Sequence, residues 1–182
     1  MSIQRERMTI LGLDTASRKT GYAVYRDGRI IAHGAWKIDP AHTFSDLEDK
    51  ILSALGRYGV TEIVAEDIYR SRDSRLQAAF DVLSQCQGVL RLISDKSGLP
   101  LWLVDARVAK REMWGYTTAR PTHRAMPRSE QKERMCRAVE RLGYRLGTDR
   151  NGRADDDEAD AIGILVTYVE KYRKLPVAHP GA

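Results

Sequence analysis

Carboxylate side chains crowd one short stretch near the end of this sequence. Five of the six residues from 155 to 160 are acidic, and the apolar segment 161–168 follows them, which indicates the start of a helix. Asp157 and Asp160 are three residues apart and share a helical face with Ile164, the face expected to turn inward. Two carboxylates entering a packed face need a compensating cation, and oxygen ligands suit Mg²⁺ or Mn²⁺.

A structural role for the same acids stays open. Carboxylates in the first turn of a helix are stabilised by the helix macrodipole and by the unpaired N–H groups there. We assign this role to Asp155 and Glu158. Asp156 is the alternative to Asp157 as a ligand, because it lies four residues before Asp160 and reaches the same face.

Two further carboxylates stand at the ends of predicted strands. The apolar run 8–15 suits a central buried strand that carries Asp14 near its carboxyl end, and the run 61–67 carries Glu66 in the same way. A single acid at a strand end is commonly a turn former. Together, four carboxylates from two strands and a helix can hold two divalent ions about 3.5–4 Å apart, the arrangement that hydrolyses phosphodiesters.

The elements that must position these acids form an α/β pattern. Residues 8–15, 20–26 and 29–38 read as an antiparallel meander with a hairpin at Asp27-Gly28. Strands at 61–67 and 101–105 then alternate with helices, which predicts a mixed five-stranded sheet with helices on both sides. The helical patterns cover residues 43–55, 73–97, 106–114, 129–142 and the segment after the acidic cluster.

Several boundaries within this pattern are also predicted. Phe44 is expected on the apolar face of the first helix, and the second apolar edge of the 73–97 helix is expected to face a partner subunit. Ser129 is expected to cap its helix, and 115–127 to form a mobile loop. We expect one domain over residues 1–175 and a disordered tail over residues 176–182.

Composition fits one ordinary globular domain. The chain has 182 residues, 42% hydrophobic and 30% charged. No apolar run has the length of a membrane span and the first residues lack the core of a signal peptide, so a cytoplasmic location is expected, without membrane contact. Cys86 and Cys136 match no metal-ligand spacing and are expected to be reduced thiols.

Positive charge is concentrated in one window. The net charge is +5, whereas residues 120–153 alone hold ten Lys or Arg against four acids. Such a run is commonly a solvated helical face, but this one has a single sign and lies beside the acidic cluster. Nucleic acid is therefore a candidate partner.

Four short motifs, in combination, are specific. They are Ile-Leu-Gly-Leu-Asp at 10–14, Thr-Gly-Tyr-Ala-Val at 20–24, Val-Ala-Glu at 64–66 and Asp-Glu-Ala-Asp-Ala at 157–161. With them, residues 9–169 resemble the RuvC-like Holliday-junction resolvases of the ribonuclease-H-like superfamily, and the compact last motif looks more like phage-type members. The chain departs from that family in Thr15-Ala16, where Pro-Gly often stands, and in a longer 113–127 connection.

The resemblance implies a ribonuclease-H-like fold and a set of roles. Asp14, Glu66, Asp157 and Asp160 look like the family's metal ligands, for two Mg²⁺ or Mn²⁺ ions per active site. Tyr69 stands where the family has an aromatic near the junction centre. Lys110 and Lys132 resemble basic residues that contact DNA beside the scissile phosphate, which gives Lys132 a catalytic role. Candidates for binding backbone phosphates, with surface charge as the alternative, are Arg72, Arg75, Arg107, Arg111 and Arg124.

The expected activity is the resolution of four-way DNA junctions by a homodimer that makes paired, metal-dependent cuts, in a bacterial cell or a phage-infected host. An RNA-processing nuclease of the YqgF type and a non-catalytic junction-binding protein remain alternatives. A sugar-kinase-like phosphotransferase also opens with an Asp on a strand, but that architecture needs a second domain, and the length of this chain argues against it.

Overall fold

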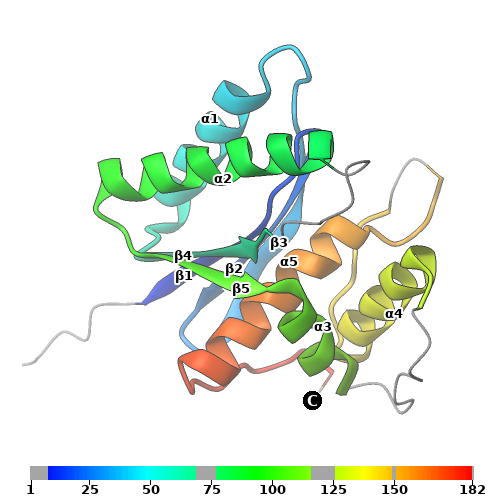
Figure 1. Ribbon diagram of the computed structural model, residues 1–182. Helices are drawn as coiled ribbons and strands as arrows, with labels where there is room; N and C mark the ends of the chain where they lie inside the picture. Colours follow the sequence, from blue (N-terminus) through cyan, green and yellow to red (C-terminus); the bar gives the residue numbers. More distant parts are fainter. Residues whose placement is uncertain (1–7, 69–76, 116–125, 149–150, 182) are drawn as a thin grey trace, which may run out of the picture.

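A five-stranded mixed sheet forms the centre of the molecule in the computed structural model (Figure 1), which describes residues 8–68, 77–115, 126–148 and 151–181. The strand order is β3-β2-β1-β4-β5, with β1, β2 and β3 antiparallel and β4 and β5 parallel to β1. This arrangement confirms the predicted fold class. The strands are β1 (Thr9–Asp14), β2 (Lys19–Arg26), β3 (Arg29–Lys37), β4 (Glu62–Asp67) and β5 (Leu101–Asp105).

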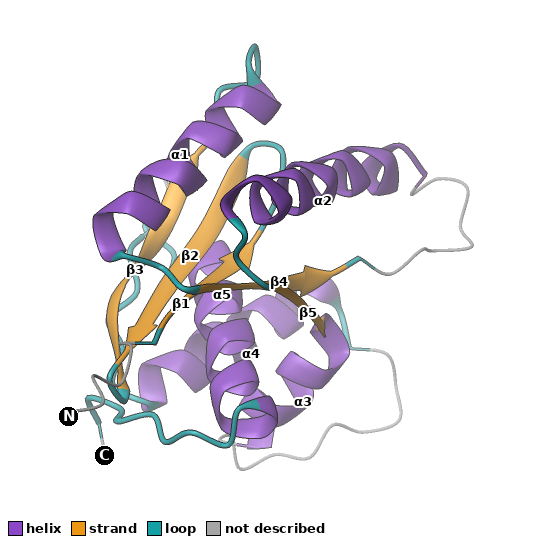
Figure 2. Ribbon diagram, turned by 90° about the vertical axis from the view of Figure 1, so that its left-hand side faces the viewer, coloured by secondary structure: helices purple, strands orange, loops and turns teal. Residues whose placement is uncertain are grey.

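Helices cover both faces of the sheet (Figure 2), with α1 and α2 on one face and α3, α4 and α5 on the other. Leu47, Ile51 and Leu90 belong to the first core, and Met135, Ile162 and Leu165 to the second. The helices are α1 (Thr43–Tyr58), α2 (Gln77–Ser97), α3 (Ala106–Gly115), α4 (Arg128–Arg141) and α5 (Asp156–Thr167), which runs on into a π-helical turn, Tyr168–Tyr172.

Two local predictions, the cap of α4 and the burial of Phe44, differ from the structure. Helix α4 begins at Arg128, after Pro127, and no side chain caps it, so Ser129 lies inside the first turn and is not the cap. Phe44 is 40% exposed at the start of α1, one turn before the buried Leu47. The hairpin is as expected, with Asp27 and Gly28 both at positive φ.

The C-terminal segment also differs from its prediction. Residues 176–181 were expected to be disordered, but hydrogen bonds hold them against the first hairpin and the end of α4. The Tyr25 hydroxyl donates to the Pro176 carbonyl at 3.1 Å, Ala178 N–H donates to Gly28 O at 2.6 Å, and Gly181 N–H donates to Leu142 O at 3.0 Å. Composition alone does not reveal these partners, because they lie far away in the sequence.

Helix α5 packs unusually close to β1 and β2. A Cβ added at Gly12 would lie 2.7 Å from Leu165 Cβ, and one added at Gly21 would lie 1.9 Å from the carbonyl oxygen of Asp157. Real Cβ atoms do not approach other atoms this closely. The two glycines therefore let the backbone of α5 rest directly on the sheet. Across the described parts of the chain, no helix is long and apolar enough to span a membrane.

Replacing Gly21 with alanine should force α5 off the sheet, because the atom that its Cβ meets is backbone and cannot rotate away. We expect a loss of about 3 kcal/mol in the free energy of unfolding, measured by urea denaturation. Gly56→Ala in α1 is the matched control, since a Cβ there meets nothing within 4 Å and alanine favours a helix. Equal stability of Gly21→Ala and wild type would contradict this close packing.

Candidate active site

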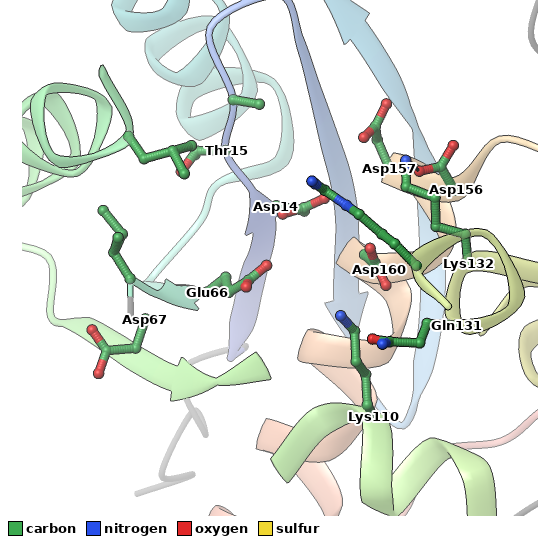
Figure 3. Close-up of a pocket in the computed structure, with 14 residues that line it drawn as sticks. Asp14, Thr15, Glu66, Asp67, Lys110, Gln131, Lys132, Asp156, Asp157 and Asp160 are labelled. Carbon is green, nitrogen blue, oxygen red and sulfur yellow. Dashed lines mark hydrogen bonds and ion pairs between the residues drawn. The ribbon is translucent and has the colours of Figure 1, made fainter. Parts of the chain in front are cut away.

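A pocket of about 310 Å³ opens where β1 and β4 end and the first turn of α5 begins. Figure 3 shows acidic and basic side chains entering it from the sheet, α3, α4 and α5. Its charged lining consists of Asp14, Glu66, Asp67, Asp156, Asp157, Asp160, Lys110, Arg128 and Lys132. The sequence predicts this convergence for six of the nine, the exceptions being Asp67, Arg128 and the alternative ligand Asp156.

Asp14 stands at the centre of the group, on the last residue of the middle strand β1. Burial raises the pKa of its carboxyl well above the ordinary value, and the charges of Asp160, Glu66 and Asp157 raise it further. Glu66, at the end of the neighbouring parallel strand β4, also shares a side-chain hydrogen bond with Asp14. Figure 3 shows Asp14, Glu66 and Asp160 facing one common space.

Asp160 meets this pair from the first turns of α5. Burial raises the pKa of its carboxyl to about 7, with Glu66, Asp156 and Asp157 adding to the rise and the ammonium of Lys110 opposing it. The cause is that several negative charges share a space from which much of the water is excluded. The site therefore holds more negative charge than its own lysines neutralise, which favours binding of a cation.

The other acids of the cluster build the start of α5, as expected. Asp155 is the N-cap, and its side chain accepts a hydrogen bond from Glu158 N–H at 3.3 Å. Glu158 is buried; it accepts a hydrogen bond from Gly147 N–H at 2.8 Å and lies 2.5 Å from His33 Nδ1 on β3. These contacts fix the helix that carries Asp157 and Asp160.

Two further acids of the pocket, Asp156 and Asp157, each have a lysine partner. Lys132 of α4 forms an ion pair with Asp156. Lys19, at the start of β2, lies with its Nζ 3.2 Å from Asp157 Oδ2. The sequence analysis missed Lys19; its only signal is its place two residues before Gly21, which pairs with Asp14 across β1 and β2.

The remaining predicted DNA-binding residues are placed only in part. Arg107 is exposed on α3 and forms an ion pair with Asp105 at 2.5 Å, and Arg111 is exposed beside Glu112. Neither is among the described residues that line the pocket. Lys110, on the same helix, does line it. Four residues lie outside the described ranges: Tyr69, Arg72, Arg75 and Arg124.

The donor set fits a hard divalent cation. Within the described ranges, no group of three or more His, Cys, Asp or Glu side chains is already arranged closely enough to hold a metal ion. Two of the candidate ligands are paired with lysines, Asp157 with Lys19 and Asp156 with Lys132. All candidate ligand atoms are carboxylate oxygens, and their mutual repulsion would be relieved by Mg²⁺ or Mn²⁺.

Two curated bacterial proteins are similar in sequence to almost the whole chain. The crossover junction endodeoxyribonuclease RuvC of Trichlorobacter lovleyi is 29% identical over 181 residues, which cover 95% of this chain and 91% of that protein. The protein of the same name from Paramagnetospirillum magneticum is 27% identical over 171 residues, or 88% of this chain and 90% of that protein. No protein-family model matches the chain.

Solved structures share the fold at lower identity. Thermus thermophilus RuvC in complex with a Holliday junction substrate aligns with a TM-score of 0.64 and 16% identity, covering 92% of this chain and 96% of that one. The fowlpox virus resolvase, solved with substrate Holliday junction DNA, aligns with a TM-score of 0.57 and 13% identity, covering 91% and 99%. At these identities the alignments establish the fold.

The raised pKa of Asp160 makes a prediction about stability in the absence of metal. Because the folded state holds this proton more tightly than the unfolded chain does, the contribution to stability is complete at low pH and is lost as the pH rises through about 7. At pH 8 in EDTA, Asp160→Asn should therefore be more stable than wild type, by an amount on the order of 2 kcal/mol.

Calorimetry in EDTA at pH 5.5 and pH 8 checks this. The advantage of Asp160→Asn should be larger at pH 8, and Asp67→Asn, at an exposed acid of the same pocket, should show no such difference. If the difference in stability between Asp160→Asn and wild type does not change with pH, the charge of Asp160 does not destabilise the folded state.

Proposed function

We propose that this chain, a RuvC-like member of the ribonuclease-H-like superfamily, is an endonuclease that resolves four-way DNA junctions by metal-dependent hydrolysis of phosphodiester bonds. The observation that carries the proposal is the convergence of Asp14, Glu66 and Asp160, from two strands and a helix, in one pocket with unrelieved negative charge. The curated relatives named crossover junction endodeoxyribonuclease support the reaction.

The proposed ligands are Asp14, Glu66, Asp157 and Asp160, for two Mg²⁺ or Mn²⁺ ions. Such ions, when bound, would supply an activated water and would stabilise the leaving 3′ oxygen. Asp14 would be the central ligand, because the charges of all three other acids act on it. Asp157 is preferred to Asp156 as a ligand because its charge contributes to the raised pKa of Asp14, whereas Asp156 is paired with Lys132.

Lysines at the pocket would orient the scissile phosphate. Lys110 acts on Asp160 from α3, and Lys132 enters from α4. Arg128, one turn before Lys132, also lines the pocket and adds a third positive charge that can bind a phosphate oxygen. Asp156 would hold Lys132 in place through their ion pair, which gives this acid a positioning role.

The proposal includes a homodimer on branched DNA. Two identical sites related by a two-fold axis match the symmetry of a four-way junction, so that paired cuts leave ends that can be joined. Along α2, Val82 and Val89 pack partly against the core of their own chain, while Leu92 is 47% exposed. A partner surface on α2 therefore remains a prediction, as do the phosphate contacts of the arginines. The expected compartment is the cytoplasm, where a bacterial or phage chromosome would supply the substrate.

Junction cleavage tests this function directly. Wild type with Mn²⁺ should cut a synthetic mobile four-way junction at symmetric positions, and Asp14→Asn or Asp160→Asn should reduce the rate by at least about 10³-fold, because each removes a metal ligand. Incision sites are mapped on labelled strands. Asp39→Asn, at an exposed acid next to α1, is the control and should cut like wild type.

Three outcomes would contradict the proposal. Equal cutting rates for wild type and Asp160→Asn would show that the proposed metal site is not needed for the reaction. Faster cutting of structured RNA than of the junction would favour an RNA-processing nuclease. Junction binding in EDTA with no cutting in Mn²⁺ would indicate a protein that only recognises junctions.

Substitutions of the neighbouring acids Asp156 and Asp157 should have different effects on metal binding and on cutting. Asp157→Asn should weaken Mn²⁺ binding and cutting together, because it removes a ligand. Asp156→Asn should leave Mn²⁺ binding intact and slow cutting by about 10-fold or more, because Lys132 loses the carboxylate that holds it. Manganese binding is measured by electron paramagnetic resonance, and the reverse pattern would make Asp156 the ligand.

A further inference from the structure

We infer that Lys19 competes with the divalent metal for Asp157, holding this carboxylate out of the metal site until an ion binds. The inference rests on the proposed metal site and adds a residue that controls how tightly that site binds its ion. It follows from the ion pairs around Lys19, from the orientation of Asp157 and from the sign of the charges.

Lys19 is anchored beside Asp157 by a second, more buried acid. Its Nζ lies 2.6 Å from Asp155 Oδ2 and 3.2 Å from Asp157 Oδ2. Asp155 is only 7% exposed and is fixed as the N-cap of α5. The ammonium is therefore held in one place by the start of the helix, and Asp157 is the carboxylate that is free to exchange one cation for another.

Asp157 is turned away from the other proposed ligands. In Figure 3 the carboxylates of Asp14, Glu66 and Asp160 face one space, whereas that of Asp157 points toward the top of the view, away from it. Lys19, which contacts Asp157, is not among the described residues that line the pocket. To join a metal ion beside Asp14, Asp157 has to rotate inward and give up Lys19.

The charges give the direction of the effect. An ammonium next to a ligand carboxylate opposes the approach of a divalent cation and neutralises the charge that attracts it. Lys110 and Lys132 also carry positive charge, but they line the pocket where a phosphate would bind, so their charge can help the substrate. Lys19 lies outside that lining. Its removal should therefore strengthen metal binding, although it also removes a stabilising ion pair.

Manganese binding without DNA tests the inference. We expect Lys19→Gln to bind Mn²⁺ about 3- to 10-fold more tightly than wild type, as measured by the free Mn²⁺ signal in electron paramagnetic resonance. Lys19→Arg, which keeps the charge, should bind like wild type. Lys50→Gln is the matched control, because Lys50 is 30% exposed, compared with 28% for Lys19, and its ion pair with Asp46 lies on α1.

The sign of the result separates competition from a structural role. If Lys19 only stabilised the start of α5, its loss would loosen the ligands, and Mn²⁺ binding would weaken or stay the same; either result overturns the inference. Asp14→Asn tests the proposed metal site on which the inference rests. If Asp14→Asn binds Mn²⁺ as tightly as wild type, the proposed metal site itself is wrong, whatever Lys19→Gln does.

A measurement on wild type covers the case in which Lys19→Gln does not fold. Release from Asp157 should make the Lys19 amine react faster with an acylating reagent, so labelling read by mass spectrometry should rise on adding Mn²⁺. Lys50 is the internal reference and should not change. Labelling of Lys19 that is unchanged or lower with Mn²⁺ would show that the ion does not displace it.

Discussion

The direct contact between the backbone of α5 and the central strands is the constraint on which the site depends. Gly12 on β1 and Gly21 on β2 leave no space for a side chain under the helix, so α5 rests on the sheet from Asp157, opposite Gly21, to Leu165, opposite Gly12. Asp14 lies two residues after Gly12 on β1. Asp160 lies directly before Ala161, the residue of α5 that lies close to both glycines. A wider gap at this contact would move Asp160 away from Asp14, whose pKa it raises more than any other neighbouring charge does.

The close contact has an electrostatic cost that the structure offsets in two ways. The innermost acids, Asp14 and Asp160, keep raised pKa values because burial and their neighbours disfavour the charged forms. The acids further out are neutralised by lysines from other elements, Lys132 from α4 and Lys19 from β2. The site is thus divided into an inner part, where the carboxyls have raised pKa values, and an outer part, where Asp156 and Asp157 are paired with lysines.

The rest of the fold fixes the helix that bears these acids. In the first turn of α5, the carboxylate of Glu158 contacts both His33 of β3 and the N–H of Gly147. Asp155 N–H donates to the Gly147 carbonyl at 2.9 Å. Tyr144 packs edge-on against His33, and its hydroxyl lies 3.1 Å from His179 in the C-terminal segment. The C-terminal segment therefore contributes to the same network that supports the helix carrying Asp157 and Asp160.

Local sequence patterns were enough to predict the secondary-structure elements and the inner acids of the pocket. Alternating strand and helix patterns, the Asp27-Gly28 turn and the acids at strand ends are local signals, so the mixed sheet and the convergence of Asp14, Glu66 and Asp160 could be predicted. The N-cap role of Asp155 was predictable for the same reason, since a cap bonds to its own helix. Contacts between distant parts of the chain could not be predicted in this way. The partners of Lys19 and Lys132 and the docking of residues 176–181 join residues far apart in the chain, and no local pattern records which distant side chain will lie within reach.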